Sequence, residues 1–92
     1  MDKLQQLRQQ IEQLDEKIIL AVAQRLDCAR KVGEYKKIHN LSIFNSEVED
    51  NKMELADELA QKFSLDKNFV RSLLYFIINE SCKEQAKIIS RG

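Results

Sequence analysis

Apolar residues recur at alternating steps of three and four along the first part of the chain. This spacing places them on one face of an α-helix, in the heptad pattern of a seam between helices. A continuous helix over about 35 residues would be about 50 Å long, which exceeds the diameter of a small domain. We therefore expect this helix to pack against a second copy of the chain, running antiparallel. The positions in the row are Leu4, Leu7, Ile11, Leu14, Ile18, Ala21, Arg25, Cys28, Val32 and Tyr35.

Two shorter helical patterns follow an interruption at residues 40–45. Asn40 can end the first helix in the left-handed conformation. Ser46 followed by Glu49 fits a capping box for the second helix, and Asp66 is the expected N-cap of the third. The predicted fold is all-α, with one long, one short and one medium helix in an antiparallel homodimer. We expect a single domain over residues 1–92, with helices over about 3–39, 46–63 and 67–89.

Composition narrows the class of protein. Hydrophobic residues make up 43% of the 92 residues and charged residues 33%, as in ordinary globular chains. The 15 basic and 15 acidic side chains cancel, whereas nucleic-acid and membrane-surface proteins usually carry a basic excess. No apolar run approaches about 18 residues, and no signal-peptide pattern opens the chain. We therefore expect a cytoplasmic protein with no nucleic-acid or membrane partner.

Motifs for metal or cofactor chemistry are not found in the sequence. There is no Gly-rich phosphate loop, no Ser/His/Asp set and no metal-ligand spacing, so neither a metal nor a cofactor is expected. Cys28 and Cys82 are expected to be small, reduced core residues, and His39 a solvated residue near a helix end. Long helices are favoured because the chain has no proline and two glycines.

Arg25 is a charged residue in the apolar row of the first helix. A buried guanidinium requires an anion, which a glutamate of a neighbouring helix or a bound ligand could supply; its stem could instead extend to solvent. Lys36 lies within about 20° of the same face and about 16 Å along the axis. The two cations could hold a small dianion, although a lysine near a helix C-terminus is also favoured by the helix dipole.

Ser81 and Gln85 place hydrogen-bonding groups where the apolar face of the last helix should continue, unless that helix simply extends into solvent there. Arg8 lies about 25 Å from Arg25 along a straight helix, so one chain cannot bring both to one small ligand. An antiparallel partner can, which gives Arg8 a possible place in a site shared between chains.

The segments "LRQQIEQLDEKI", "AQRLDCARKVGEYKK" and "FVRSLLYFIINESCKEQ" resemble the all-helical chorismate mutases. The family pattern reads L-R-x-x-I-x-x-[IL]-D, then A-x-R and [IV]-[GA]-x-x-K, and in the last helix F-[IV]-x-x-[LI]-[FY]-x-x-I-I-x-x-S-x-x-x-Q. The resemblance spans residues 4–85 without a gap. It implies an intertwined homodimer with two shared active sites, and the rearrangement of chorismate to prephenate on the way to phenylalanine and tyrosine.

The resemblance also implies a role for each polar residue. This rearrangement is pericyclic, so it needs a folded substrate geometry and donors at the breaking C–O bond rather than a nucleophile, metal or cofactor. Lys36 and Gln85 would be catalytic, and the remaining residues would bind substrate. Arg8 of the partner chain would bind one substrate carboxylate, and Arg25 with Ser81 would bind the other. Lys36 would contact a carboxylate and the ether oxygen, to which Gln85 would also donate. Glu49 would hold the ring hydroxyl.

The chain departs from the family where members read P-[IV]-x-D-x-x-R-E and this chain reads "SIFNSEVE". Ser42 stands for the proline, Asn45 for the aspartate and Val48 for the arginine, while Glu49 is kept. We expect Asn45 and Val48 in the substrate site, with weaker binding or a substrate that differs from chorismate around the ring. Glu49 is also explained by the capping box.

Three alternatives stay open at this point. One is an isochorismate-pyruvate lyase on the same scaffold, and another is a mutase of an amino-substituted chorismate. The third is a helical dimer that binds a metabolite of the aromatic pathway without catalysis.

Overall fold

The computed structural model describes residues 2–91, except for the side chain of Ser46. It consists of helices α1 (Lys3–His39), α2 (Ser46–Lys62) and α3 (Lys67–Ser90), and no strand occurs among the described residues. The predicted all-α class with a long, a short and a medium helix is therefore confirmed. Over the same residues, no helix is both long enough and apolar enough to cross a membrane.

Local capping residues set most of the helix ends. Asn40 ends α1 in the left-handed conformation, with φ 55° and ψ 41°, as predicted. Asp66 begins α3 as predicted, because its carboxylate accepts a hydrogen bond from the backbone N–H of Phe69 at 2.9 Å. His39, the last residue of α1, is exposed as predicted and its ring lies 4.2 Å from that of Tyr35.

The beginning of α2 differs from the prediction. Its N-cap is Asn45, whose side-chain oxygen accepts hydrogen bonds from the backbone N–H groups of Glu47 and Val48 at 3.1 and 3.3 Å. The prediction that Ser46 is the N-cap of this helix is therefore wrong, and the Ser46 side chain of the expected capping box with Glu49 lies outside the described residues. Asparagine caps a helix as well as serine does, and the extended backbone of Asn45 marks the point where the helix starts. Glu49 is consequently available for another role.

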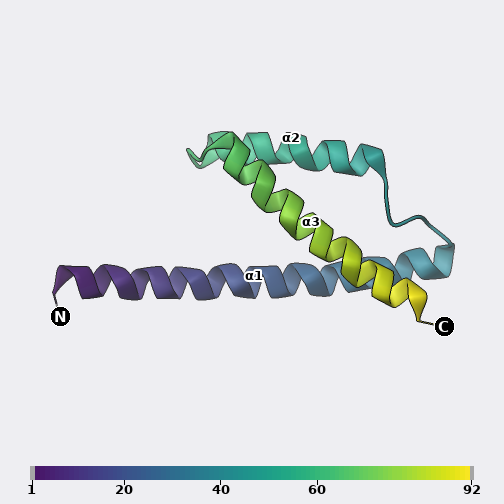
Figure 1. Cartoon of the computed structure of the whole chain (residues 1–92), viewed down its shortest axis with the longest axis horizontal. Helices are drawn as coiled ribbons and strands as arrows, with labels where there is room; N and C mark the ends of the chain where they lie inside the picture. Colours follow the sequence, from purple (N-terminus) through teal and green to yellow (C-terminus); the bar gives the residue numbers. More distant parts are fainter. Residues whose placement is uncertain (1, 92) are drawn as a thin grey trace.

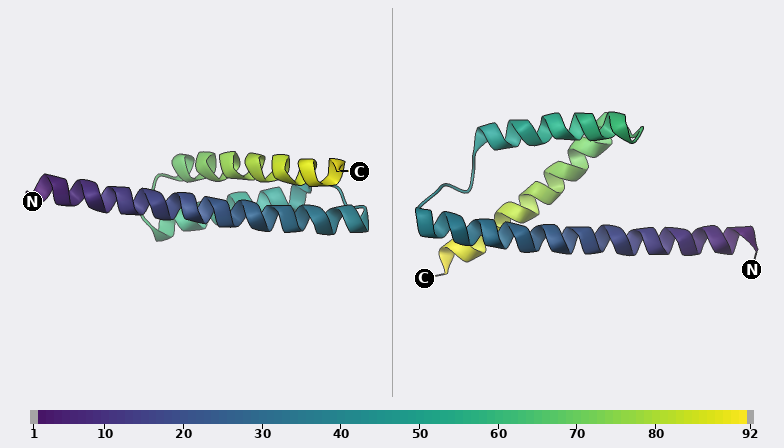
Figure 2. Two further views of the ribbon diagram at one scale, coloured as in Figure 1. Left: turned by 90° about the horizontal axis from the view of Figure 1, so that it is seen from below. Right: turned by 180° about the vertical axis from the view of Figure 1, so that it is seen from behind.

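Helix α3 packs against both other helices, whereas α1 and α2 do not pack on each other (Figures 1 and 2). Its N-terminal half joins α2 through a small core of Ala56, Ala60 and Val70. An ion pair between Asp57 and Arg71, at 2.6 Å, lies beside this core. Because the two ends of α3 meet different partners, a space lined by all three helices is left between α1 and α2.

The C-terminal half of α3 crosses α1 (Figure 2), and the α1 residues Ala29 and Gly33 are buried. A Cβ atom on Gly33 would lie 3.1 Å from the Cα atom of Gln85, so the two backbones approach very closely here. An ion pair between Arg30 and Glu84, at 3.2 Å, braces the same crossing. Small residues in α1 therefore determine how deeply α3 settles on it.

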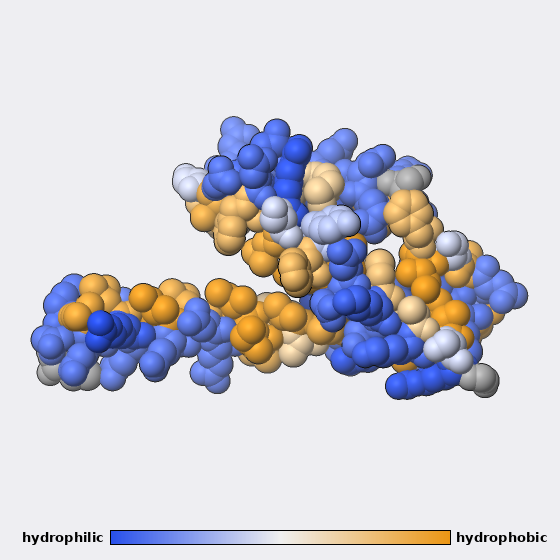
Figure 3. All heavy atoms as spheres, viewed as in Figure 1, coloured by the Kyte–Doolittle hydropathy of each residue, from blue (hydrophilic) through white to orange (hydrophobic). Residues whose placement is uncertain are grey.

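The N-terminal half of α1 extends beyond the rest of the chain as an arm (Figure 1). The chain measures 56 × 28 × 14 Å, and its radius of gyration is 16.8 Å, against about 12 Å for a compact domain of this length. Apolar side chains follow the arm in Figure 3. An exposed apolar stripe of this length is typical of an interaction surface. Its members are Leu4, Leu7, Ile11, Leu14 and Ile18, each between 42% and 57% exposed.

Neither cysteine belongs to the core of the single chain. Cys28 is exposed and Cys82 is half-buried, and both are free. The expectation of core cysteines is therefore wrong for this chain, because α3 covers α1 along the line of Ala29 and Gly33 rather than along the heptad row.

Candidate active site

A cavity of about 520 Å³ lies between α1, the loop 40–45, α2 and the C-terminal half of α3. Its size suits a small molecule. Seven of the eight predicted site residues line it: Arg25, Lys36, Asn45, Val48, Glu49, Ser81 and Gln85. The eighth, Arg8, lies on the exposed arm and is not brought to the cavity by its own chain.

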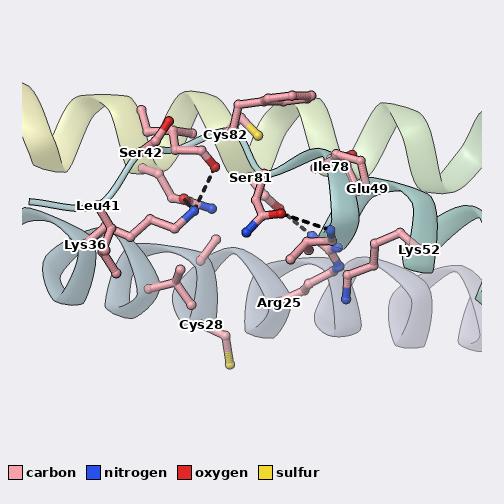
Figure 4. A pocket seen from close by; sticks show the side chains of 17 residues that line it. Arg25, Cys28, Lys36, Leu41, Ser42, Glu49, Lys52, Ile78, Ser81 and Cys82 are labelled. Atoms are coloured by element: carbon pink, nitrogen blue, oxygen red, sulfur yellow. Dashed lines mark hydrogen bonds between the residues drawn. The ribbon is translucent and has the colours of Figure 1, made fainter. Parts of the chain in front are cut away.

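Arg25 is held at one end of the cavity by Ser81 (Figure 4). The guanidinium Nη1 donates a hydrogen bond to Ser81 Oγ, and this hydroxyl donates to the backbone carbonyl of Ile77 at 3.0 Å. Within the described part of the chain, no carboxylate lies within 4.0 Å of the guanidinium. Arg25 is thus oriented by a neutral, buried partner, and its positive charge stays available to a ligand.

Lys36 and Gln85 form a second pair in the same cavity. The ammonium Nζ of Lys36 donates to Gln85 Oε1 at 2.9 Å and to the backbone carbonyl of Ile43 at 2.8 Å. An ammonium group has three donors, so one remains for a ligand. Because Gln85 accepts through its oxygen, its NH₂ group is left to donate elsewhere. The bond to Ile43 also ties the loop 40–45 to α1, which closes this side of the cavity.

Gly33 makes the second pair possible, although sequence reasoning did not single it out. It lies one turn before Lys36 and directly beneath Gln85, whose backbone would meet any added Cβ at 3.1 Å. Glycine inside a helix costs about 1 kcal/mol relative to alanine, so its presence in α1 needs a reason. Close approach of the two helices supplies one. A lone glycine inside a predicted helix of 37 residues was the signal that could have revealed it.

Lys52 is a second residue that sequence reasoning missed. It lines the cavity from α2 and is half-buried. The lining therefore contains three cations, Arg25, Lys36 and Lys52, against a single carboxylate, Glu49. The signal in the sequence was its position four residues after Val48, one helical turn further along the same face. The cavity has an excess of positive charge and suits an anionic molecule.

The two altered family positions both lie at the cavity, and both are exposed. The side chain of Asn45 is engaged in capping α2, so its role there is structural at least in part. Val48 presents an uncharged surface at the same edge. The family pattern has an aspartate and an arginine at these two positions, so this chain lacks one acidic and one basic side chain at this edge of the cavity.

The carboxylate of Glu84, next to the cavity residue Gln85, forms ion pairs with Arg30 and Lys87. The pKa of Glu84 is lowered, mainly by its hydrogen bond from Lys87 and next by that from Arg30. Glu84 therefore stays ionised and links α3 to α1 one residue before Gln85. Elsewhere in the chain as described, no cluster of three or more His, Cys, Asp or Glu residues could hold a metal ion.

The fold and the cavity define an all-helical protein with a small-molecule site made of cations and neutral hydrogen-bond donors. Residues 7–86 match the protein family described as chorismate mutase type II. The chain belongs to this family. Its membership confirms the predicted chorismate mutase function and the predicted enzyme class, an intramolecular isomerase.

The names of individual relatives state different activities. The chain is 30% identical over 95 aligned positions to a 4-amino-4-deoxychorismate mutase of Streptomyces pristinaespiralis, covering 99% of this chain and 70% of that protein. A protein of the same name from Streptomyces venezuelae is 27% identical, with 98% of this chain and 87% of that protein covered. A bifunctional chorismate mutase/prephenate dehydratase of Buchnera aphidicola is 27% identical over 91% of this chain, which spans 22% of that protein.

Proposed function

We propose that this chain converts chorismate to prephenate, in the cytoplasm, as a step toward phenylalanine and tyrosine. The observation that carries the proposal is the bond between Lys36 Nζ and Gln85 Oε1 in the same cavity as Arg25. In this rearrangement the ether C–O bond breaks while a C–C bond forms, and negative charge develops on the ether oxygen. Two donors held together at one end of a cationic cavity suit that charge.

The two pairs divide the work between binding and catalysis. Arg25, oriented by Ser81, binds one substrate carboxylate, which fixes the substrate at its end of the cavity. Lys36 uses its remaining donor for the other end, and Gln85 donates its NH₂ group to the ether oxygen. Holding both ends of the substrate keeps its enolpyruvyl arm folded over the ring. This geometry lowers the activation barrier, because less conformational entropy is then lost on reaching the transition state. No residue has to act as a base or nucleophile.

Glu49 is proposed to hold the ring hydroxyl. It lines the cavity, is half-buried, and makes no ion pair within the residues that the structure describes. A carboxylate that is not paired can accept a hydrogen bond from a substrate hydroxyl. This role follows the assignment implied by the family pattern, and the capping duty that competed with it is carried by Asn45.

Arg8 is proposed to complete the site from a second copy of the chain. The apolar arm that carries it is exposed over all of residues 2–20, and a chain of this size gains stability by covering such a face. An antiparallel partner would place its own arm beside the middle of α1, where Arg25 lies. The site would then be shared, and the assembly would be an intertwined homodimer with two such sites.

Incubation with chorismate tests the proposed reaction directly. Purified protein should consume the chorismate absorbance and form prephenate, which acid converts to phenylpyruvate. Arg25→Ala and Lys36→Ala should each abolish turnover while circular dichroism shows an unchanged helical content. A parallel assay with isochorismate, read by salicylate fluorescence, tests for a lyase. If the protein consumed isochorismate but not chorismate, the chain would be a lyase and the proposed reaction would be wrong. If it bound either compound without converting it, a non-catalytic metabolite-binding dimer would be favoured.

A second candidate reaction is the same rearrangement of 4-amino-4-deoxychorismate. The uncharged pair Asn45 and Val48 at the cavity favours it, because the rim differs there from the family pattern. Two relatives that share about three residues in ten with this chain carry the name of that activity. The ratio of kcat/KM for chorismate and for the amino compound, measured on one preparation, decides between the two substrates.

A further inference from the structure

We infer that Lys52, on α2, binds a carboxylate of the substrate, as the third cation that this chain supplies to its own cavity beside Arg25 and Lys36. This inference rests on the proposed function, since it assumes a dianionic substrate in the cavity of Arg25 and Lys36. It adds a residue that occupies no position of the family pattern. The cation that this pattern places at position 48 would thereby be replaced by one a helical turn later.

The position of Lys52 carries the first part of the inference. It is half-buried and lines the cavity, and Figure 4 shows its side chain extending from α2 toward α1 at the end of the cavity that Arg25 occupies. It follows Glu49 by three residues and Val48 by four, so all three share one face of α2. A lysine stem is long enough to offset the rise of about 5 Å in one helical turn.

The surroundings of Lys52 carry the second part. The ammonium group makes no ion pair or hydrogen bond within the described residues, and neither does the carboxylate of Glu49 one turn before it. Some exposed lysines of the chain are paired: Lys67 lies 3.6 Å from Asp57, and Lys83 lies 3.1 Å from Glu80. An unpaired ammonium kept beside Arg25 is repelled by it, and a bound anion would remove that repulsion.

Substitution of Lys52 by methionine tests the inference, because methionine keeps most of the stem and removes the charge. KM for chorismate should rise about tenfold, with little change in kcat, since one charge-assisted hydrogen bond to the ground state is lost. The salt dependence of kcat/KM should also weaken. Lys52→Arg should keep KM near the parental value. Lys62→Met is the matched control, because Lys62 lies on α2 outside the cavity and is exposed, and its KM should not change.

A relocation variant separates charge from packing. Adding Val48→Arg to Lys52→Met should restore binding, because it returns a cation to the same face one turn earlier. If Lys52→Met unfolds, as judged by circular dichroism, Lys52→Gln replaces it. Unchanged KM and unchanged salt dependence in the folded variant would overturn the inference while leaving the proposed function intact.

If the protein does not convert chorismate, equilibrium binding tests the role of Lys52 separately from the proposed reaction. Should the parent protein not convert chorismate, the proposed reaction is wrong, and calorimetric binding of chorismate to the parent and to Lys52→Met is compared instead. Weaker binding by the variant supports the role of Lys52. Equal binding, or no binding by the parent, contradicts it.

Discussion

The ammonium group of Lys36 donates to the side-chain oxygen of Gln85 at 2.9 Å, next to Gly33, where the backbones of α1 and α3 approach closely. This arrangement orients the amide of Gln85, whose remaining NH₂ group can donate at any ordinary pH. It also makes the pair sensitive to any change that introduces charge at position 85 or bulk at position 33.

Replacing Gln85 by glutamate should make activity depend on pH. A glutamate must be protonated to donate to the ether oxygen, and the adjacent ammonium of Lys36 favours its ionised form. We expect kcat/KM of Gln85→Glu to fall as the pH rises through the pKa of the new carboxyl, while the parent shows no such loss. A pH profile from acid to neutral conditions measures this. A variant as active as the parent at neutral pH would contradict the donor role.

Substitutions of Gly33 should lower activity in the order of their size. An alanine Cβ would lie 3.1 Å from the Cα atom of Gln85, so α3 must move by a few tenths of an ångström. We expect a severalfold loss of kcat/KM for Gly33→Ala and about a hundredfold loss for Gly33→Val, because small misplacements at a catalytic group are costly. Ala23→Val, at an exposed position of α1, is the control. Equal activities of Gly33→Val and parent would show that the crossing does not position Gln85.

Mixing two inactive variants should restore activity if sites are shared. Arg8→Ala and Arg25→Ala each remove a different part of one site, which two chains would supply. After subunit exchange at equal amounts, half of the dimers combine both chains and each contains one intact site, so about a quarter of the parental activity should return. The measurement is chorismate turnover before and after exchange. No recovery, with dimers demonstrated by light scattering, would place Arg8 outside the site.

Asp57→Asn should make the chain less stable and less sensitive to acid. The pKa of Asp57 is lowered, chiefly by its hydrogen bond from Arg71, with the charges of Arg71 and Lys67 adding to the effect. A carboxyl with a lowered folded-state pKa stabilises fully above its ordinary pKa, and this contribution is lost as the pH falls through the folded-state value. Urea unfolding at several pH values and one protein concentration measures the free energy of unfolding. For the variant it should be lower at neutral pH, and it should decrease less than that of the parent as the pH falls. Asp50→Asn, on the same helix, should show neither change.

Some features of the site were predictable because they depend on residues close in sequence. The faces of α1 and α3 follow from spacing alone, and the residues chosen on that basis, Arg25, Lys36, Ser81 and Gln85, line the cavity. The family pattern added Asn45, Val48 and Glu49, which also line it. The prediction for the N-cap of α2 was wrong by one residue, because asparagine and serine are adjacent and nearly equal as caps.

Other features depended on contacts that sequence spacing does not contain. Arg25 could have paired with a glutamate, but it bonds to Ser81, 56 residues away. Lys52 was overlooked because a lysine on a short helix is usually solvated, and only the position of α2 places it at the cavity. Both cysteines were expected in a core that the single chain does not form around them.

The sequence by itself determined the three helices and their ends near Asn40 and Asp66. It also determined which polar side chains lie on otherwise apolar helix faces. Both follow because helical period and capping act within a few residues. The tertiary structure decided which of those side chains meet. It joined Lys36 to Gln85 beside Gly33, bonded Arg25 to Ser81, and brought Lys52 to the same cavity. These relationships depend on how deeply α3 settles against α1 and α2, a balance of packing between segments about fifty residues apart that no local pattern encodes.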